Sequence, residues 1–311
     1  MASRSDSRFS LLEWGAIWMV VVVWGVNNAA GKLATAALPP LFVGGVRFLV
    51  ALVLLLPFIR PPFPDWKSFL PVVLIMGPIH FGLVYTGFYL AHNLSLFSVS
   101  LQLWIPLTAL FSWLILGETM PRPALIGMAL SFAGVAFMTL DPKASADVEA
   151  VLVGFVASNF WALGTVLVRR LPPVRAMKVQ GCCSLVAAPV LLALAFITDP
   201  HMLQKAKAAT PLVWASLVYA GAVSSVLATV AVFWLVQRRE AGRFTPYLLT
   251  TPLVTAVLGV SFFGDVLGPR LLIGAAATLG GVAIVALAER RRPGRAVEIP
   301  AAAAAQVVSQ D

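Results

Sequence analysis

Long apolar blocks alternate with short polar connections along the whole chain. Ten blocks are close to about 20 residues long, the length at which an α-helix crosses the hydrocarbon core of a bilayer. The expected spans are Leu11–Leu33, Leu41–Ile59, Phe69–Leu90, Ser95–Leu116, Ala124–Leu140, Ala150–Val168, Val179–Ile197, Pro211–Val236, Phe244–Phe263 and Leu271–Leu287. Proline or glycine lies in many of the connections, as is typical of breaks between helices. The pattern predicts an all-α integral membrane protein with ten transmembrane helices.

One part of the chain recurs about 147 residues later, which indicates an internal duplication. The identical pairs are Gly117 and Gly264, Leu125 and Leu272, Ile126 and Ile273, Gly127 and Gly274, Ala129 and Ala276, Gly134 and Gly281, Val135 and Val282, Ala136 and Ala283, and Leu140 and Leu287. Glu118 likewise matches another acid, Asp265. The sequence therefore predicts two repeats of five spans each, residues 11–147 and 148–290. They lie between a cytoplasmic N-terminal tail, residues 1–10, and a disordered cytoplasmic tail, residues 291–311.

Lysine and arginine are divided unevenly between alternate connections. Sixteen of the 22 lie in the set that includes both termini, whereas the other set holds Lys32, Lys143, Lys205, Lys207 and Arg270. By the positive-inside rule both termini are expected in the cytoplasm. Since each repeat has an odd number of spans, the second must enter the membrane in the opposite sense. Such inverted repeats are typical of secondary transporters that expose one central site to either side in turn.

The same topology separates the two duplicated acids. Glu118 is expected at the cytoplasmic side and Asp265 at the opposite side, so they cannot meet at one central site. We therefore expect the repeated glycine–acid segments to act as scaffold or helix-end caps.

Composition agrees with a lipid environment and excludes several functions. The chain is 60% hydrophobic and only 11% charged, far below the charged fraction of a soluble domain. The net charge of +9 is scattered between spans, so we read it as a topology signal and expect no nucleic-acid partner. Cys182 and Cys183 are adjacent in an apolar run, which argues against a disulfide framework and a four-ligand metal site. No catalytic motif is present, and we expect no enzyme activity, metal or cofactor.

Several residues carry a resemblance to a known family. They are Trp24-Gly25, Arg47-Phe48, Pro106, Leu116-Gly117-Glu118 and Gly127. In these the chain resembles, over residues 11 to 290, the EamA-type branch of the drug/metabolite transporter superfamily. The combination of His80, Trp104 and Trp161 is similar to the bacterial aromatic amino acid exporters of the YddG type. The second half departs from the pattern, since Asp265 replaces the usual Glu and Gln180 stands where Arg47 stands in the first.

Polar side chains at membrane depth are costly and need a partner or a wet cavity. They are Asn27, Asn28, Lys32, Arg47, His80, Tyr85, Tyr89, Gln102, Asn159, Ser224, Ser225, Thr250 and Thr251. All 13 acids lie in tails, connections or span ends, which leaves no carboxylate for a proton relay or a sodium site. We expect facilitated transport or exchange, with His80 the one group that titrates near neutral pH. Arg47 is expected to snorkel or to bond carbonyls of a neighbouring span.

The expected substrate-binding residues are Trp24, Asn27, His80, Trp104, Pro106, Asn159, Trp161, Thr250 and Thr251. Tryptophan faces can stack on an aromatic ring, while amide and hydroxyl groups can satisfy the ends of a zwitterion. Two plain alternatives stay open. His80 can be a core histidine satisfied by a carbonyl, and Trp104 can face lipid.

Prolines and glycines mark the expected kinks in the helices. Pro106 and Pro252 lie mid-span at nearly matching places of the two repeats, and Gly77 and Pro78 loosen the third span. Bent fourth and ninth spans would then flank a midplane site. Trp104 is expected to face Thr250 and Thr251 across it.

Together these features predict an alternating-access exporter of amino acids, aromatic ones first, in the bacterial inner membrane. The expected partners are a small-molecule substrate and lipid, and a monomer is expected. Organic cations would also suit the aromatic faces, and Arg47 with Lys32 could instead hold a phosphorylated metabolite. A channel, an intramembrane enzyme and a receptor are the remaining alternatives.

Overall fold

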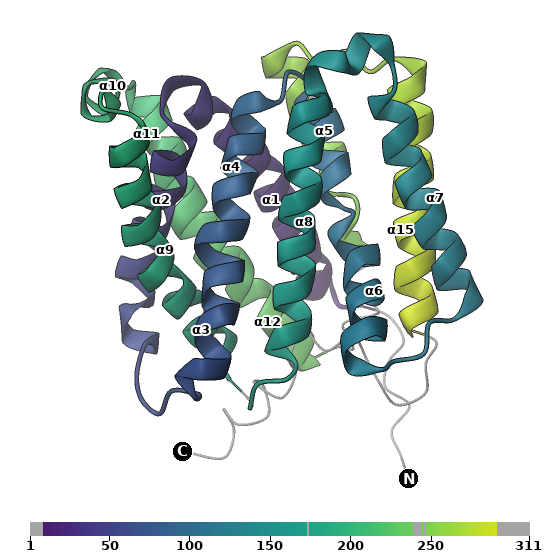
Figure 1. The fold of residues 1–311 in the computed structure, drawn as a ribbon, viewed down its shortest axis with the longest axis horizontal. Coiled ribbons are helices and arrows are strands. Elements are labelled where there is room, and N and C mark those ends of the chain that lie inside the picture. Colours follow the sequence, from purple (N-terminus) through teal and green to yellow (C-terminus); the bar gives the residue numbers. More distant parts are fainter. Residues whose placement is uncertain (1–8, 173, 239–243, 245–246, 291–311) are drawn as a thin grey trace.

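The computed structural model describes residues 9–172, 174–238, 244 and 247–290, and every regular element in these ranges is helical. The α-helices are α1 (Leu11–Ala37), α2 (Pro40–Leu55), α3 (Trp66–Leu74), α4 (His80–Leu90), α5 (Leu94–Leu101), α6 (Trp104–Leu116), α7 (Arg122–Thr139), α8 (Val148–Val168), α9 (Ala176–Thr198), α10 (Met202–Ala208), α11 (Pro211–Val218), α12 (Ala228–Arg238), α14 (Thr251–Leu258) and α15 (Pro269–Arg290). Short 3₁₀ turns are η1 (Leu56–Phe58) and η3 (Pro142–Asp147), and π-helical segments are η2 (Ile75–Ile79), η4 (Tyr219–Leu227) and η5 (Gly259–Phe263). Figure 1 shows the long helices side by side in one bundle.

Nine helical stretches in the described part of the chain are long and apolar enough to cross a membrane. They are Leu11–Ala37, Pro40–Phe58, Trp66–Leu90, Leu94–Leu116, Arg122–Thr139, Ala144–Val168, Ala176–Thr198, Pro211–Val232 and Pro269–Ala288. Large apolar side chains such as Phe262 and Ile197 are about three-quarters exposed, as expected of a surface that faces lipid. The chain is a multi-pass membrane protein. The expected ninth span, Phe244–Phe263, lies partly outside the described residues, and its described helical part is Thr251–Phe263.

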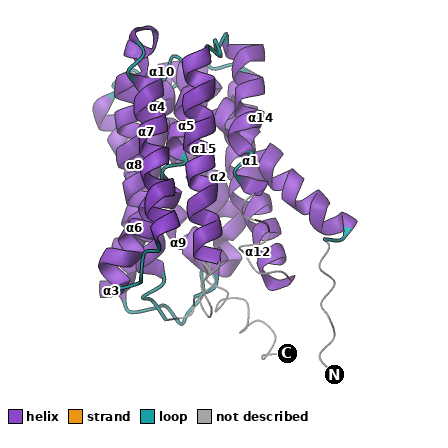
Figure 2. Ribbon diagram, turned by 90° about the vertical axis from the view of Figure 1, so that its right-hand side faces the viewer, coloured by secondary structure: helices purple, strands orange, loops and turns teal. Residues whose placement is uncertain are grey.

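Local sequence explains where many of these helices begin and end. Ser10 and Glu13 form a capping box at the start of α1, which is tilted relative to the upright helices (Figure 2). Proline occupies the first turn of α2, α7 and α11, where its missing N–H has no helical partner to lose. Gly117 closes α6 and Gly264 closes η5, both with a left-handed backbone, φ 66° and 72°.

The tightest helix pair is α7 against α15, at one edge of the bundle in Figure 1. A Cβ at Gly127 would lie 2.6 Å from the Gly281 carbonyl oxygen, and one at Gly134 would lie 2.6 Å from that of Gly274. Between these two contacts, the Ser131 hydroxyl donates to the Thr278 carbonyl at 3.3 Å, and the Thr278 hydroxyl to the Ser131 carbonyl at 3.4 Å. Glycine is needed here because the two backbones approach within touching distance.

Five apolar clusters lie in the described part of the bundle, and the two largest share α1. The larger of these two includes Phe42, Tyr85, Phe88 and Phe97, and its residues come from α1, α2, α4, α5, α8, α9, α10 and α11. The second packs Ile17, Val20 and Val21 of α1 against α12, Phe244 and Leu248. Between them, α1 is the helix that belongs to both clusters.

Candidate functional site

His80 and Trp161 are the two expected site residues that the structure brings together. His80 begins α4 directly after the π-helical segment η2, and its ring centroid lies 4.8 Å from that of Trp161 on α8. The Phe81 ring meets both, at 4.7 Å from His80 and 6.0 Å from Trp161. The Nδ1 atom of His80 lies 2.9 Å from the Ala157 carbonyl oxygen. Because a carbonyl only accepts, Nδ1 carries the proton and Nε2 keeps its lone pair in the neutral ring.

Arg47 on α2 extends this group into a cluster that the sequence did not predict as a site. Its side chain is 6% exposed, and its Cζ lies 4.3 Å from the centroid of the Phe81 ring. Its Nε donates to the Ser225 hydroxyl at 3.0 Å, and its Nη1 donates to the Tyr85 hydroxyl at 3.2 Å. The expectation that Arg47 snorkels or bonds carbonyls is therefore wrong, because its hydrogen-bond partners are hydroxyl groups of two neighbouring spans.

We call Arg47, His80, Phe81, Tyr85, Trp161 and Ser225 the Arg47 cluster. Its members come from α2, α4, α8 and η4, and both π-helical segments concerned, η2 and η4, lie in spans that contribute to it. π-helical turns are frequent at functional sites because they displace side chains from the regular helical register. Gly77 and Pro78 lie buried in η2, where a Cβ at Gly77 would lie 3.2 Å from the Cys183 carbonyl oxygen of α9. The helical register of the third span therefore changes directly before His80.

Trp104 and Pro106 lie where the fourth span is interrupted. The span breaks at Gln102 and Leu103, where the missing N–H of Pro106 would otherwise donate to the Gln102 carbonyl. α5 ends at Leu101 and α6 restarts at Trp104, with Pro106 buried in its first turn. The Ile105 N–H donates to the Gln102 carbonyl, so the Leu101 carbonyl is left for the Ser158 hydroxyl of α8, 3.1 Å away. A neighbouring helix thereby satisfies the freed backbone group.

The ninth span is interrupted at the matching place. Leu249 and Thr250 form a turn before α14, at the repeat spacing from the turn at Gln102 and Leu103. Pro252 follows in the first turn of α14, so this break also lies directly before a mid-span proline. The Thr250 hydroxyl donates to the Tyr247 backbone carbonyl at 2.6 Å, and the Thr251 hydroxyl donates to the Leu248 backbone carbonyl at 2.7 Å. These two hydroxyls are therefore occupied by their own chain segment, and their role toward Trp104 stays a prediction.

The remaining expected residues lie on α1 and α8. Trp24 packs against the second apolar cluster and not against the His80–Trp161 pair. Asn159 donates to the Phe155 carbonyl of its own helix at 2.8 Å. The Asn27 Oδ1 atom is buried and is the one such side-chain atom within the described ranges that has no hydrogen-bond partner. The neighbouring Asn28 uses both N–H groups of its amide, which donate to the hydroxyls of Ser98 on α5 and Thr255 on α14, both at 3.1 Å.

Two acids that the sequence placed in connections cap the start of α5. Asp147 accepts from the backbone N–H groups of residues 92 and 93 at 2.6 and 2.9 Å. Asp265 accepts from the N–H groups of Leu94 and Ser95 at 3.1 and 2.7 Å, and from the Ser95 hydroxyl at 2.5 Å. Carboxylates there satisfy N–H groups that have no helical partner. The expectation that the duplicated acids cap helix ends is confirmed for Asp265.

Comparison with known proteins identifies relatives along almost the whole chain. The model of the EamA-like transporter family matches twice, at residues 13–140 and 148–287. "Uncharacterized transporter YvbV" of Bacillus subtilis is 28% identical over 90% of this chain and 93% of its own. "Uncharacterized inner membrane transporter YedA" of Escherichia coli is 23% identical, covering 92% and 94%. "Probable amino-acid metabolite efflux pump" of Salmonella typhimurium is 25% identical, covering 91% and 95%.

A solved structure described as "Crystal structure of protein" has a similar fold. Its TM-score is 0.59 at 18% sequence identity, and the match covers 90% of this chain and 98% of that one. At this identity the likeness concerns the fold alone.

Proposed function

Because this chain belongs to the EamA-like transporter family, and is thus a membrane transporter and not an enzyme, we propose that it exports aromatic amino acids or similar small metabolites. The observation that carries this proposal is the group of rings from His80, Phe81 and Trp161. The buried Arg47 side chain lies beside them and can bind a polar group. Aromatic faces and edges at these spacings suit another aromatic ring. One relative's name, a probable amino-acid metabolite efflux pump, agrees with this substrate class.

We propose that ten spans form two inverted repeats of five. The contacts of α7 with α15 support this, because residues at equivalent positions exchange partners. Gly127 meets Gly281 while their counterparts Gly274 and Gly134 meet each other, and the equivalent pair Ser131 and Thr278 meets between them. Such reciprocity is what a two-fold axis through the central pair produces. The two matches to the family model support the same division of the chain, residues 11–147 and 148–290.

We propose that both termini are cytoplasmic and that the protein lies in a bacterial inner membrane. The distribution of lysine and arginine supports the orientation. A relative named as an inner membrane transporter supports the location. Interrupted fourth and ninth spans would let the halves rock about a midplane site, which is alternating access.

We propose facilitated transport or exchange as the mechanism. Within the described residues, the Arg47 cluster contains no carboxylate, so no acidic proton relay runs through it. The Nδ1 proton of His80 is held by the Ala157 carbonyl, which fixes the ring as a wall of the site rather than a free proton carrier. Uptake rates that follow an imposed proton gradient, and lose that dependence in His80→Ala, would contradict this mechanism.

The test of the substrate is uptake into liposomes that contain only this protein. Labelled Trp, Phe, Thr, a quaternary amine and a phosphorylated sugar are compared at equal concentration. We expect saturable, protein-dependent uptake of Trp and Phe, reduced about fivefold in Trp161→Ala, since a stacking partner is worth about 1 kcal/mol. Absence of Trp and Phe flux would overturn the proposal. Flux that never saturates would indicate a channel, and preferred uptake of the amine or the sugar phosphate would support the other carrier classes.

A further inference from the structure

Arg47 and Asn27 carry an inference about how the substrate is oriented, and it rests on the proposed function. We propose that the Arg47 guanidinium binds the substrate carboxylate and that the Asn27 Oδ1 atom accepts a hydrogen bond from its ammonium group. The site would then select zwitterionic amino acids over amines and over simple carboxylates.

The first step is the charge of Arg47. A cation that is 94% buried at membrane depth is costly unless an opposite charge or several hydrogen bonds compensate it. Over the described residues, no Asp or Glu pairs with Arg47, and its two partners are the neutral hydroxyls of Ser225 and Tyr85. A substrate carboxylate would supply the missing negative charge.

The second step is the free edge of the guanidinium. The group has five N–H donors in a planar fork, of which the bonds to Ser225 and Tyr85 use one on Nε and one on Nη1. The plane is held over the Phe81 ring at 4.3 Å, so its orientation is fixed before any ligand arrives. The Nη2 atom makes no hydrogen bond to any described residue. This leaves a preorganised donor edge of the kind that binds carboxylates in a bidentate way.

The third step is the distance between cation and ring wall. Phe81 contacts Arg47, His80 and Trp161, so one residue links the cation to the other two rings. A cation and aromatic rings in one cluster suit an aromatic amino acid, in which one methylene joins the α-carbon to the ring.

The fourth step is Asn27. Val23, Asn27 and Gly31 are spaced by four residues and so lie on one face of α1. On that face the Val23 carbonyl accepts from the Tyr219 hydroxyl of η4 at 3.0 Å, and a Cβ at Gly31 would lie 3.4 Å from Tyr85 Cε1. The flanking contacts thus reach Tyr85, which is a partner of Arg47, and η4, the segment that also contains the other partner, Ser225.

Asn27 therefore lies between two α1 residues whose contacts include η4 and Tyr85, and its Oδ1 atom has no donor within the described residues. A buried acceptor without a donor costs about 1–3 kcal/mol, which a ligand N–H would recover. An ammonium group is such a donor. An organic cation without a carboxylate would meet the Arg47 charge, and a simple carboxylate would leave Asn27 unsatisfied, so the zwitterion fits both groups best.

The test is competition against labelled Phe uptake in liposomes containing the full chain. The competitors are unlabelled Phe, phenethylamine, which lacks the carboxylate, and 3-phenylpropionate, which lacks the ammonium. For the unaltered protein we expect each analogue to inhibit at least about tenfold more weakly than Phe, as expected when a charged hydrogen-bond partner is lost.

Two variants test which residue recognises the carboxylate and which recognises the ammonium group. In Arg47→Gln the ratio of inhibition by Phe to inhibition by phenethylamine is expected to fall toward one. In Asn27→Leu the ratio of inhibition by Phe to inhibition by 3-phenylpropionate is expected to fall. Lys32→Gln is the matched control, because Lys32 is the other basic residue of the first two spans and donates to the Ala91 carbonyl at 2.5 Å instead. It is expected to keep both ratios.

The outcomes separate this inference from the proposed function. Two results would overturn the proposed orientation of the substrate without affecting Phe transport. One is equal inhibition by Phe and phenethylamine in the unaltered protein. The other is an Arg47→Gln variant that keeps both inhibition ratios. Absence of Phe flux in the unaltered protein would overturn the proposed function and this inference together. Should Arg47→Gln fail to fold, the competition between Phe and phenethylamine in the unaltered protein still tests whether the site recognises the carboxylate.

Discussion

The two copies of the glycine–acid turn share one backbone but not one chemistry. In each copy a glycine with positive φ, Gly117 or Gly264, ends a helix. The N–H of the next residue then donates to a carbonyl six residues back, from Glu118 to Ser112 at 3.4 Å and from Asp265 to Gly259 at 3.1 Å. The side chains differ in their partners, since Glu118 pairs with Arg169 at 2.5 Å.

The Asp265 carboxylate instead receives three hydrogen bonds at the start of α5. Both acids are almost fully buried, at 7% and 6% exposure. The two turns therefore share one backbone frame, while each acid has its own stabilising partners. Among the described contacts, none joins either acid to the Arg47 cluster, which agrees with a scaffold role.

The largest effect is expected at Asp265. Asp265→Asn removes the charge and places an amide N–H₂ against backbone donors, so we expect the protein to lose about 2–4 kcal/mol of unfolding free energy. Unfolding in mixed micelles, followed by tryptophan fluorescence, measures it. Ser95→Ala removes only one of the three bonds and is expected to cost about 1 kcal/mol. A loss at Asp265→Asn no greater than that of Ser95→Ala would contradict the cap.

A smaller effect is expected for the ion pair at the other copy. Arg169 is 20% exposed and also donates to the Ser112 hydroxyl at 3.1 Å, so Glu118→Gln keeps part of the contact. We expect Glu118→Gln and Arg169→Gln each to cost about 1–2 kcal/mol, after allowance for solvent at Arg169, with a coupling of about 1 kcal/mol in the double variant. Additive losses would show that the two side chains do not stabilise each other. The same micelle unfolding assay provides the numbers.

The glycines test whether the shared backbone matters equally in both copies. No heavy atom lies within 4 Å of a Cβ placed at Gly117 or Gly264, so an alanine there meets only the strain of positive φ. Gly117→Ala and Gly264→Ala are each expected to cost about 1 kcal/mol, with similar values because the turn is the same. Gly268 has equal space and no positive φ, so Gly268→Ala is the matched control and is expected to change little. Unequal losses at Gly117 and Gly264 would break the parallel between the copies.

The sequence predicted features that depend on local pattern and missed most contacts between distant residues. Nine of the ten expected spans and the repeated turns follow from hydropathy and glycine position. A cap at Asp265 was expected, but its partners Leu94 and Ser95, about 170 residues away, were not. Pro106 indicated a break in the fourth span, but not that α6 restarts at Trp104. The His80–Trp161 pair was among the expected residues, yet nothing in the sequence showed that the two rings touch.

The partners of Arg47 were the main miss. Tyr85 and Ser225 lie 38 and 178 residues away, and Ser225 lies in the π-helical segment η4. The 3.6-residue period of a regular helix cannot predict which side chains meet across such distances. One signal was present in the sequence: an arginine in a span with no acid at membrane depth to pair with it.

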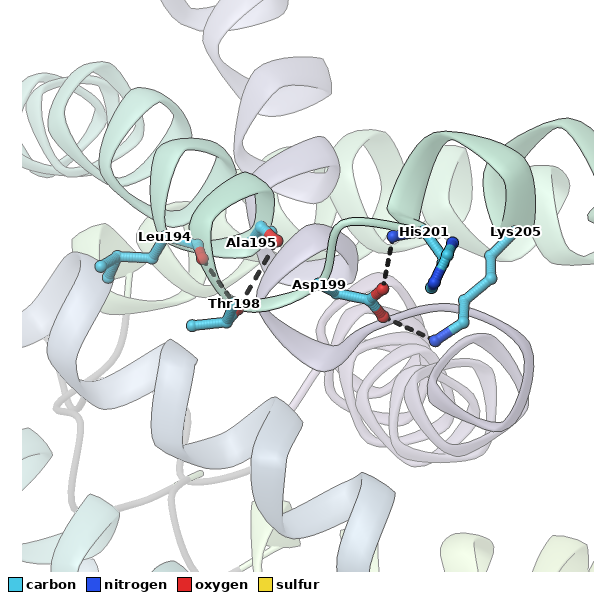
Figure 3. A network of polar contacts seen from close by, with 6 residues as sticks. All are labelled: Leu194, Ala195, Thr198, Asp199, His201 and Lys205. Carbon is cyan, nitrogen blue, oxygen red and sulfur yellow. Dashed lines mark hydrogen bonds and ion pairs between the residues drawn. The ribbon is translucent and has the colours of Figure 1, made fainter.

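The smallest effect is expected outside the membrane, at the turn between α9 and α10. There the Lys205 ammonium donates to Asp199 Oδ2 at 2.6 Å and the His201 backbone N–H donates to Oδ1 at 2.9 Å (Figure 3). The hydrogen bond from Lys205 is the main cause that holds the pKa of Asp199 below its ordinary value.

A depressed carboxyl pKa stabilises the fold above the unfolded pKa of about 4, and the stabilisation is lost as pH falls through the lower folded value. Lys205→Gln should therefore raise the Asp199 pKa, measurable by carboxyl NMR titration. Any drop in Tm should be present at pH 7, shrink as pH falls through the folded pKa of Asp199, and stay below those of all the buried variants, because solvent screens this exposed pair. A Tm loss as large as that of Asp265→Asn would show that the surface turn, and not the buried cap, holds this end of the bundle together.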